Sequence, residues 1–309
     1  MFDYRTFATR KLAGLGTRYL PFADVATDDV PMGRLLRLSL FQVTVGMALV
    51  LLVGTLNRVM IVELDVAATL VAVMLALPLI FAPFRTLIGF KSDVHVSALG
   101  LRRIPYIWKG TLCQFGGFAI MPFALLVLSG YGEAVDAPRW IGLGAAGLSF
   151  LLVGAGVHIV QTVGLALATD LVDEADQPKV VGLMYVMLLL GMVVAALVFG
   201  ALLENYTPGR LIQVIQGCAV VTVALNMLAM WKQEARNRVR AQEMKVAKPM
   251  QFGQAWQQLT QTKGMIRLLV VIGLGTFGFC MADVLLEPYG GQALGLSVGD
   301  TTKLTALFA

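Results

Sequence analysis

Seven long runs without charged residues constrain this chain more than any other feature of its sequence. Six of them reach at least about 19 residues, and a helix of that length crosses the hydrocarbon layer of a bilayer. The seventh reaches a similar length through the apolar residues beyond Asp283. We therefore predict seven transmembrane helices, over Leu38–Leu56, Val66–Phe84, Gly110–Gly132, Trp140–Thr169, Val180–Leu203, Leu211–Trp231 and Leu268–Ala282, with an eighth apolar run beginning at Leu304.

The composition agrees with a membrane protein. Hydrophobic residues make up 58% of the 309-residue chain and charged residues only 14%, whereas soluble domains carry about 25% charged residues. The net charge is +5, but the basic residues gather in particular loops, so we expect no nucleic-acid partner. Because lysine and arginine favour the inner side, their distribution places the N-terminus in the cytoplasm. The three cysteines fall inside apolar runs and are expected to be packing residues.

One long polar stretch, residues 232–263, is basic and follows the sixth apolar run. Six helices, a basic cytoplasmic linker and further helices are the layout of the major facilitator superfamily, whose halves are repeats. We expect an all-α integral membrane protein with this fold. Its parts would be a cytoplasmic segment 1–33, a six-helix bundle 34–231, the linker and the start of a second bundle, 264–309. The last apolar run begins at Leu304, and the chain stops inside the eighth helix that it predicts. We therefore expect this chain to be the N-terminal part of a twelve-helix protein.

The connection between the second and third predicted helices, residues 89–110, resembles the cytoplasmic motif of that superfamily, G-x-x-x-D-R-x-G-R-R/K. Gly89 and Asp93 have the spacing of the motif, and Arg102 and Arg103 resemble its end, displaced by an insertion. Arginines at this position can bridge neighbouring helix ends through charge-assisted hydrogen bonds, which would latch the cytoplasmic face. The alternative is that these charges only anchor the loop on the inner side.

Three further charges lie within or close to the apolar runs. Asp283 and Glu287 are four residues apart, hence on one face of the seventh helix, which Pro288 is expected to close. Arg58 lies near the periplasmic end of the first helix, which is equivalent to the seventh in the facilitator fold. Because unpaired charges at such depth are costly, we predict an ion pair between Arg58 and Glu287, with Asp283 one turn away, that holds the periplasmic side closed. Independent snorkelling of each charge to water is the alternative.

Five blocks of the sequence carry a more specific resemblance. They are GTLNRVMIVEL (54–64), ALPLIFAPFRTLIGFKSD (76–93), LRRIPYIWKGTLCQFGGFAIMPFAL (101–125), YVMLLLGM (185–192) and LLEPYGGQALGLSV (285–298). Together they are similar to the bacteriochlorophyll delivery family, the PucC/LhaA group of facilitator-fold proteins in purple phototrophic bacteria.

This resemblance implies an assembly factor for light-harvesting antenna complexes in the bacterial inner membrane, at its intracytoplasmic photosynthetic part. It implies delivery of bacteriochlorophyll to antenna polypeptides, or chaperoning of those polypeptides. The expected partners are the antenna α/β polypeptides or the reaction centre–antenna core complex, together with membrane lipid. Carotenoid or lipid would be further ligands beside bacteriochlorophyll.

A pigment carrier needs an axial ligand for magnesium and an apolar slot for the macrocycle. Of the two histidines, His95 lies in a cytoplasmic loop, but His158 lies well inside the fourth predicted helix. Gly154, Gln161 and Thr162 share its helix face, and glycine allows a flat ring or another backbone to approach. We name these four residues as the candidate pigment site. The alternatives are a histidine hydrogen-bonded to a neighbouring helix and a proton relay.

Two other functions compete with antenna assembly. One is a proton-coupled secondary transporter of an anionic or amphipathic solute, with Asp283 and Glu287 as proton carriers and Arg58 as an anion clamp. The other is a structural subunit of a photosynthetic complex. The sequence offers no nucleophile–base arrangement, phosphate loop or metal cluster, so we do not expect an enzyme.

Overall fold

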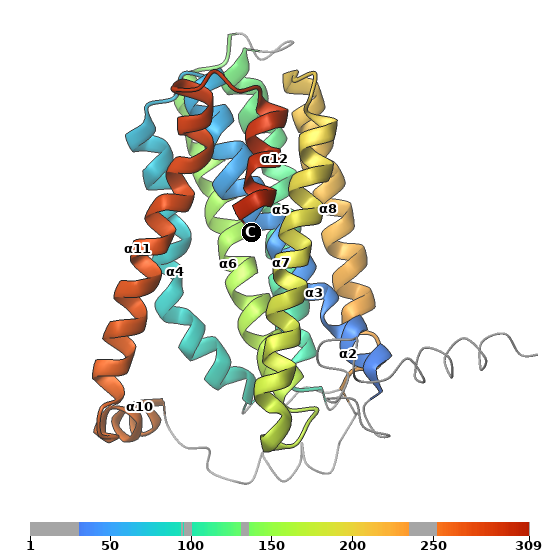
Figure 1. The fold of residues 1–309 in the computed structure, drawn as a ribbon, viewed down its shortest axis with the longest axis vertical. Helices are drawn as coiled ribbons and strands as arrows, with labels where there is room; N and C mark the ends of the chain where they lie inside the picture. Colours follow the sequence, from blue (N-terminus) through green and yellow to red (C-terminus); the bar gives the residue numbers. More distant parts are fainter. Residues whose placement is uncertain (1–30, 94, 96–100, 131–135, 235–251, 309) are drawn as a thin grey trace, which may run out of the picture.

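The computed structural model describes residues 31–93, 95, 101–130, 136–234 and 252–308, and this part of the chain is helical with short connections (Figure 1). Seven of its helices are long and apolar enough to cross a membrane. The predicted all-α integral membrane fold is therefore confirmed. Most of the predicted segment 1–33, and about half of the predicted linker 232–263, lie outside the described residues.

The first span, Met32–Glu63, is built from four consecutive elements. In chain order the structure contains α2 (Met32–Leu38), α3 (Leu40–Leu49), the π-helical segments η2 (Val50–Leu56) and η3 (Val59–Glu63), α4 (Ala68–Asp93), α5 (Ile104–Ser129), α6 (Arg139–Thr169), the short 3-10 helix η5 (Glu174–Asp176), α7 (Gln177–Leu202), α8 (Pro208–Met230), α10 (Phe252–Gln261), α11 (Met265–Gln292) and α12 (Val298–Phe308).

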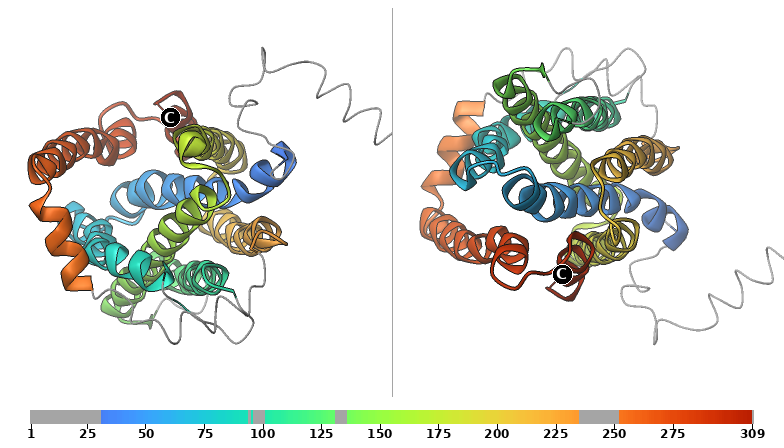
Figure 2. Two further views of the ribbon diagram at one scale, coloured as in Figure 1. Left: turned by 90° about the horizontal axis from the view of Figure 1, so that it is seen from below. Right: turned by 90° about the horizontal axis from the view of Figure 1, so that it is seen from above.

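The central helix of the bundle is α3, as the end-on views show (Figure 2). It packs against α6, α7 and α8. The closest helix pair is α5 and α6, because glycines on each side remove the side chains that would separate them. A methyl group on Gly117 would collide with Val153, and one on Gly156 would collide with the backbone of Gly110. Such small-residue contacts drive helix association where lipid leaves no hydrophobic force between helices.

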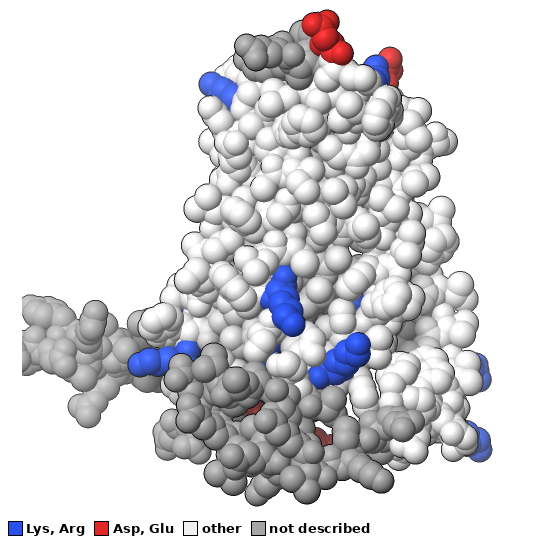
Figure 3. All heavy atoms as spheres, turned by 180° about the vertical axis from the view of Figure 1, so that it is seen from behind, with Lys and Arg blue, Asp and Glu red and all other residues white. Residues whose placement is uncertain are grey.

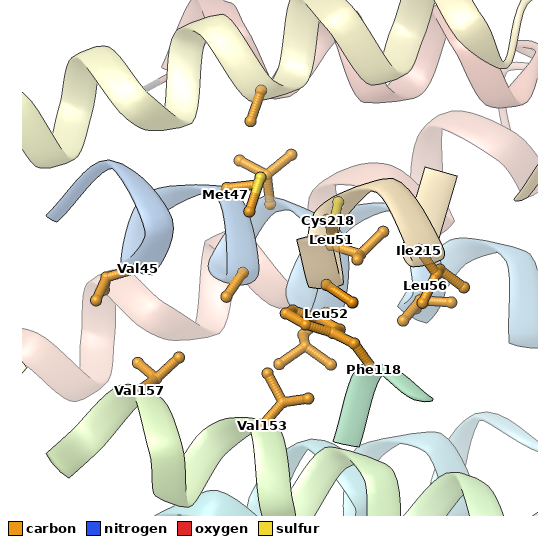
Figure 4. Packing of buried hydrophobic residues seen from close by; sticks show 14 of the residues in the cluster. Val45, Met47, Leu51, Leu52, Leu56, Phe118, Val153, Val157, Ile215 and Cys218 are labelled. Carbon is orange, nitrogen blue, oxygen red and sulfur yellow. The ribbon is translucent and has the colours of Figure 1, made fainter. Parts of the chain in front are cut away.

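The core of the bundle fills the space between the first span, α5, α6 and α8. In this layer Leu52 of the first span lies beside Phe118 of α5, and Leu56 lies beside Ile215 of α8, while Val153 belongs to the same cluster from α6 (Figure 4). Cys218 of α8 is buried here, as expected for a packing residue, whereas Cys113 is half-buried and Cys280 lies exposed on α11.

Most helices extend beyond the uncharged runs, and in two of them the structure shows the reason. The helix α4 continues to Asp93 instead of ending near Phe84, because Arg85 and Asp93 both find polar partners on neighbouring elements. The helix α11 runs through Pro288 to Gln292, which corrects the expectation that proline closes it. Proline lacks an N–H and leaves the carbonyl of Val284, four residues earlier, without its helical partner. The side chain of Asn57 donates to that carbonyl at 2.7 Å.

The helices α11 and α12 join the six-helix bundle in different ways. Only the last part of α11 touches the first span, at η2 and η3, and its buried residues are Glu287, Pro288 and Gly290. The rest of α11 is exposed and apolar (Figure 1). The following helix α12 packs along α7, where Gly200 and Gly299 bring the two backbones together. The described start of the predicted second bundle is therefore attached mainly through α12 and the end of α11.

The surface is divided along the long axis of the bundle. On the face shown in Figure 3, acidic and basic side chains lie near the top, a broad band below them shows no charged residue, and basic side chains appear again in the lower half. An uncharged middle with charges towards the ends is the pattern of a protein that crosses a bilayer.

Candidate functional site

Arg103 is the centre of a charge cluster at the end of the bundle where α4 ends and α5 begins, which we call the latch end. Its guanidinium donates to Asp170 after α6, with Nε–Oδ2 at 2.5 Å and Nη2–Oδ1 at 3.1 Å. It pairs with Asp93 at 2.7 Å and donates to Ser92 at 3.1 Å. Arg102 contacts the same carboxylate of Asp170. The structure thus brings Asp93, Arg102 and Arg103 together, and their latching role stays a prediction.

Glu234 completes this cluster from the segment after α8. Its carboxylate accepts the backbone N–H groups of Arg102 (2.8 Å), Arg103 (3.1 Å) and Ile104 (3.2 Å). These groups belong to the start of α5, where backbone N–H groups lack helical partners and a negative charge is favoured. Glu234 therefore caps the start of α5, whereas Asp93 of the motif lies at the end of α4. The cluster therefore connects α4, α5 and α6 to the segment that follows the sixth span.

The pKa of Arg103 shows how these contacts balance. Burial lowers the pKa of the guanidinium, but the hydrogen bonds and charges of Asp170 and Asp93 outweigh burial and leave the pKa above its ordinary value. Arg103 is therefore charged throughout the physiological pH range, and the cluster is held by pairing that does not depend on pH there.

The four residues of the candidate pigment site face α4. Pro78 of α4 fills the space above Gly154, so that a side chain at this position would collide with the proline ring. Thr162 packs against Gly89, at 3.6 Å from the position of a Cβ atom. Gly89, which the motif assigned to the latch, therefore serves the contact between α4 and α6. Of the two neighbours predicted for Gly154, a flat ring or another backbone, the structure shows the second.

Arg85 occupies the next turns of this contact. Its Nε donates to Thr162 Oγ1 at 2.9 Å, and its Nη2 donates to Gln161 Oε1 at 3.2 Å. An isolated arginine near a helix end would extend to water, but this side chain is held against α6. Within the described residues it has no carboxylate partner at ion-pair distance. Its positive charge is therefore not neutralised by a nearby carboxylate, and several of its N–H donors are unused. They lie beside the α6 face that carries Gly154, His158, Gln161 and Thr162, which we call the histidine face.

His158 lies between the contacts made by Pro78 and Arg85 and is half-buried. Its Nδ1 is buried without a hydrogen-bond partner, and the backbone of Pro78 is a polar group close to the imidazole. Its Nε2 is not enclosed in this way. The imidazole thus lies against α4 with Nδ1 buried, and Nε2 is the less enclosed nitrogen.

A second polar group of residues joins the first span to α11 and α12 at the opposite end of the bundle. Arg58 pairs with Glu63 at 2.7 Å and donates to the carbonyl of Leu296 at 2.8 Å. Glu287 is 1% exposed and accepts hydrogen bonds from Thr305 at 2.5 Å and Thr302 at 3.4 Å. The structure therefore places Arg58 and Glu287 in one junction but gives each its own partners instead of the predicted ion pair.

The remaining residues of the junction fit around this carboxylate. Gly54 of η2 leaves the space that the Glu287 carboxylate occupies, and Thr55 contacts Thr302 at 3.2 Å. Asp283 is exposed on α11 and so does not share the environment of Glu287, although the two lie four residues apart. The first span thus contacts both α11 and α12 through buried polar groups.

A third buried network crosses the middle of the six-helix bundle. Asn226 of α8 accepts a hydrogen bond from Thr44 of α3 at 2.9 Å and donates to Thr111 of α5 at 3.0 Å. Gln42 and Gln114 are also fully buried, and neither side chain has a hydrogen-bond partner within the described part of the chain. Buried amides usually have hydrogen-bond partners. The side-chain amides of Gln42 and Gln114 therefore leave hydrogen-bond donors and acceptors in this layer unused.

Several of these partners were absent from the sequence prediction. Asp170 and Glu234 each stand next to a predicted helix end, which was a usable signal for capping or pairing. Arg85 directly follows the second predicted helix, and only the tertiary contact with α6 reveals its role. Asn57 was recognisable in principle, since a proline within a helix predicts a free carbonyl that needs a donor.

Comparison with known proteins gives consistent matches. The chain matches the family model described as PUCC protein over residues 55–309. It is 74% identical to Protein PucC of Rhodobacter capsulatus, over 99% of this chain and 66% of that protein. It is 64% identical to Protein PucC of Rhodovulum sulfidophilum, over 98% of this chain and 67% of that protein. For Protein PucC of Cereibacter sphaeroides the identity is 60%, over 96% and 64%. The chain thus spans about two thirds of the length of these relatives.

Proposed function

Because the chain belongs to the PucC family, we propose that it is an assembly factor for bacterial light-harvesting antenna complexes. In this proposal it delivers bacteriochlorophyll to antenna polypeptides, or chaperones them, in the photosynthetic inner membrane with its N-terminus in the cytoplasm. The partners are the antenna α/β polypeptides or the reaction centre–antenna core complex. The multi-pass helical structure supports a membrane location, and the α6 face that carries His158 supports pigment binding.

The observation that carries the proposal is the setting of His158. The magnesium of a bacteriochlorophyll takes an axial nitrogen or oxygen ligand, and neutral imidazole is a common metal ligand in proteins. A ligating histidine usually directs its other ring nitrogen to a backbone carbonyl or carboxylate. Here Nδ1 is buried and the backbone of Pro78 lies close to the imidazole, while Nε2 is the less enclosed nitrogen. The donor set fits the pigment, and His158 would hold its magnesium.

Arg85 would position the same pigment. Two of its five N–H donors are used by Gln161 and Thr162. The others are free to donate to the carbonyl oxygens on the edge of a chlorin-type ring. Gly154 is filled by Pro78, so the macrocycle would lie on the outer side of the α4–α6 contact instead of between the two helices.

The transporter alternative receives less support from the arrangement of its proposed groups. It requires Asp283 and Glu287 to act together, but the first is exposed and the second is buried among threonines of α12. It also requires a free Arg58 as an anion clamp, whereas Arg58 is paired with Glu63 and bonded to Leu296.

The test is complementation of a purple phototroph that lacks the corresponding gene. The full-length gene should restore the absorption bands of assembled antenna, and the deletion should lower these bands while free bacteriochlorophyll is still made. His158→Leu should restore little antenna, and His95→Leu, which changes the other histidine, should restore it fully. Full restoration by His158→Leu would remove the ligand role. Normal antenna in the deletion strain would contradict the assembly function itself.

A further inference from the structure

A groove of about 690 Å³ lies on the side of the bundle away from the histidine face. It forms because α7 and α8 both pack on α3 but make few contacts with each other. Val43 and Met47 of α3 line it together with residues of α7 and α8. Between its walls, Gly217 faces open space, since a side chain there would meet no atom within 4 Å.

The walls of this groove fit a hydrocarbon chain. Val194 and Val198 of α7 and Val214 and Val221 of α8 supply branched apolar surface. Along α8 the lining extends from Arg210 to residue 225, which is about 22 Å at the helical rise. One leaflet of the hydrocarbon layer is about 15 Å thick, half of the full thickness. The groove is therefore long enough to hold an acyl chain through the full thickness of one leaflet.

The end of the groove carries a positive charge. Arg210 stands in the first turn of α8, with Gln213 three residues further, and both line the groove. Arg210 is exposed, and its side chain makes no hydrogen bond or ion pair with the described residues. Its backbone N–H is capped by Thr207 at 3.1 Å. The guanidinium is thus free, and it stands at a helix N-terminus, where negative charge is favoured.

We propose that this groove binds a phospholipid with an anionic headgroup, whose phosphate contacts Arg210 and Gln213 and whose acyl chain lies between α7 and α8. Guanidinium forms paired hydrogen bonds with phosphate oxygens. The positive charge at the mouth favours an anionic headgroup over a zwitterionic one, because the choline cation of the latter is repelled by Arg210. A transmembrane helix of another protein is a poorer occupant, since a helix with its side chains is about 10 Å wide and so about 80 Å² in cross-section. A groove of about 690 Å³ that extends about 22 Å along α8 leaves a mean cross-section of only about 30 Å².

The experiment measures which lipids stay bound. The protein is reconstituted into vesicles of equal parts phosphatidylglycerol and phosphatidylcholine, extracted in mild detergent, and analysed by native mass spectrometry. The proposal predicts one retained phosphatidylglycerol in clear excess over phosphatidylcholine. Arg210→Gln should lower that excess about tenfold or more, as the loss of charge-assisted hydrogen bonds implies.

Two further variants test the position of the acyl chain. Gly217→Leu fills the groove and should abolish retention, whereas Gly116→Leu, also facing open space but on α5, should not. Arg139→Gln removes an arginine at the same end of the bundle and should leave retention unchanged. Equal retention of both lipids, undiminished selectivity in Arg210→Gln, or undiminished retention in Gly217→Leu would each overturn the proposal. Occupation by a polypeptide would do the same.

Discussion

The hydrogen bond from Asn57 to the carbonyl of Val284 allows a quantitative test of the junction between the first span and α11. Asn57 is 1% exposed, and the carbonyl is free because Pro288 cannot donate to it. A buried carbonyl without a partner costs about 1–3 kcal/mol. We therefore expect Asn57→Leu to lower the free energy of unfolding by about 1–3 kcal/mol, measured by denaturation in mixed micelles.

The decisive comparison places the same change in a Pro288→Ala background. Alanine at this position donates its own N–H to Val284, so that Asn57 is no longer the sole donor. Asn57→Leu should then cost little, which gives a coupling free energy of about 1–2 kcal/mol between the two positions. An equal cost of Asn57→Leu in both backgrounds would refute the reasoning, because it would mean that the carbonyl of Val284 does not depend on Asn57.

Three further predictions concern other contacts. Arg103→Lys should destabilise the protein by about 1–2 kcal/mol in the same unfolding assay, since an ammonium cannot reproduce the forked contacts with Asp170; an unchanged stability would contradict the latch. Gly154→Ala should cost about 1–3 kcal/mol by overpacking against α4, while Gly144→Ala, which faces open space, should not; equal effects would contradict the α4–α6 contact. Burial and the nearby Glu63 raise the pKa of Tyr206 to about 12. The stabilising effect of the neutral phenol is therefore fully present below about pH 10 and declines between about pH 10 and 12. The difference in unfolding free energy between the wild type and Tyr206→Phe should shrink over that range, and a constant difference would contradict this prediction.

The sequence predicted the spans well where uncharged runs have clear ends. The fourth predicted helix, Trp140–Thr169, differs from α6 by one residue, because Pro138 precedes it and Asp170 follows it. The ends of α4 were missed, since its last turns carry charges that only tertiary partners on α6 and α5 satisfy. Charge along a helix thus marks the membrane boundary only where the charge is not bound within the protein.

The partner of Arg58 was missed for a local reason. Sequence reasoning looks for pairs three or four residues apart, as in an α-helix, and Glu63 is five residues away. The segment η3 is π-helical, and its wider turns bring residues five apart onto one face. The nearer carboxylate therefore binds Arg58, and Glu287 is satisfied by threonines of α12. Neither the π-helical winding nor the position of α12 follows from the periodicity of the apolar residues.

The candidate pigment site shows a mixed result. The shared face of Gly154, His158, Gln161 and Thr162 was predicted from helical spacing, and the structure directs that face to α4. Which neighbour would occupy the face was not predictable, since glycine admits a helix as readily as a flat ring. Arg85 adds a charge to this face through its contacts with Gln161 and Thr162, although in sequence it lies just beyond the second predicted helix.

The absorption spectrum of the gently purified full-length protein tests the central claim most directly. If His158 holds bacteriochlorophyll, the preparation should show the visible and near-infrared bands of the bound pigment. These bands should be lost or shifted in His158→Leu and unchanged in His95→Leu. A colourless preparation without antenna polypeptides, or a spectrum that His158→Leu leaves intact, would contradict the account.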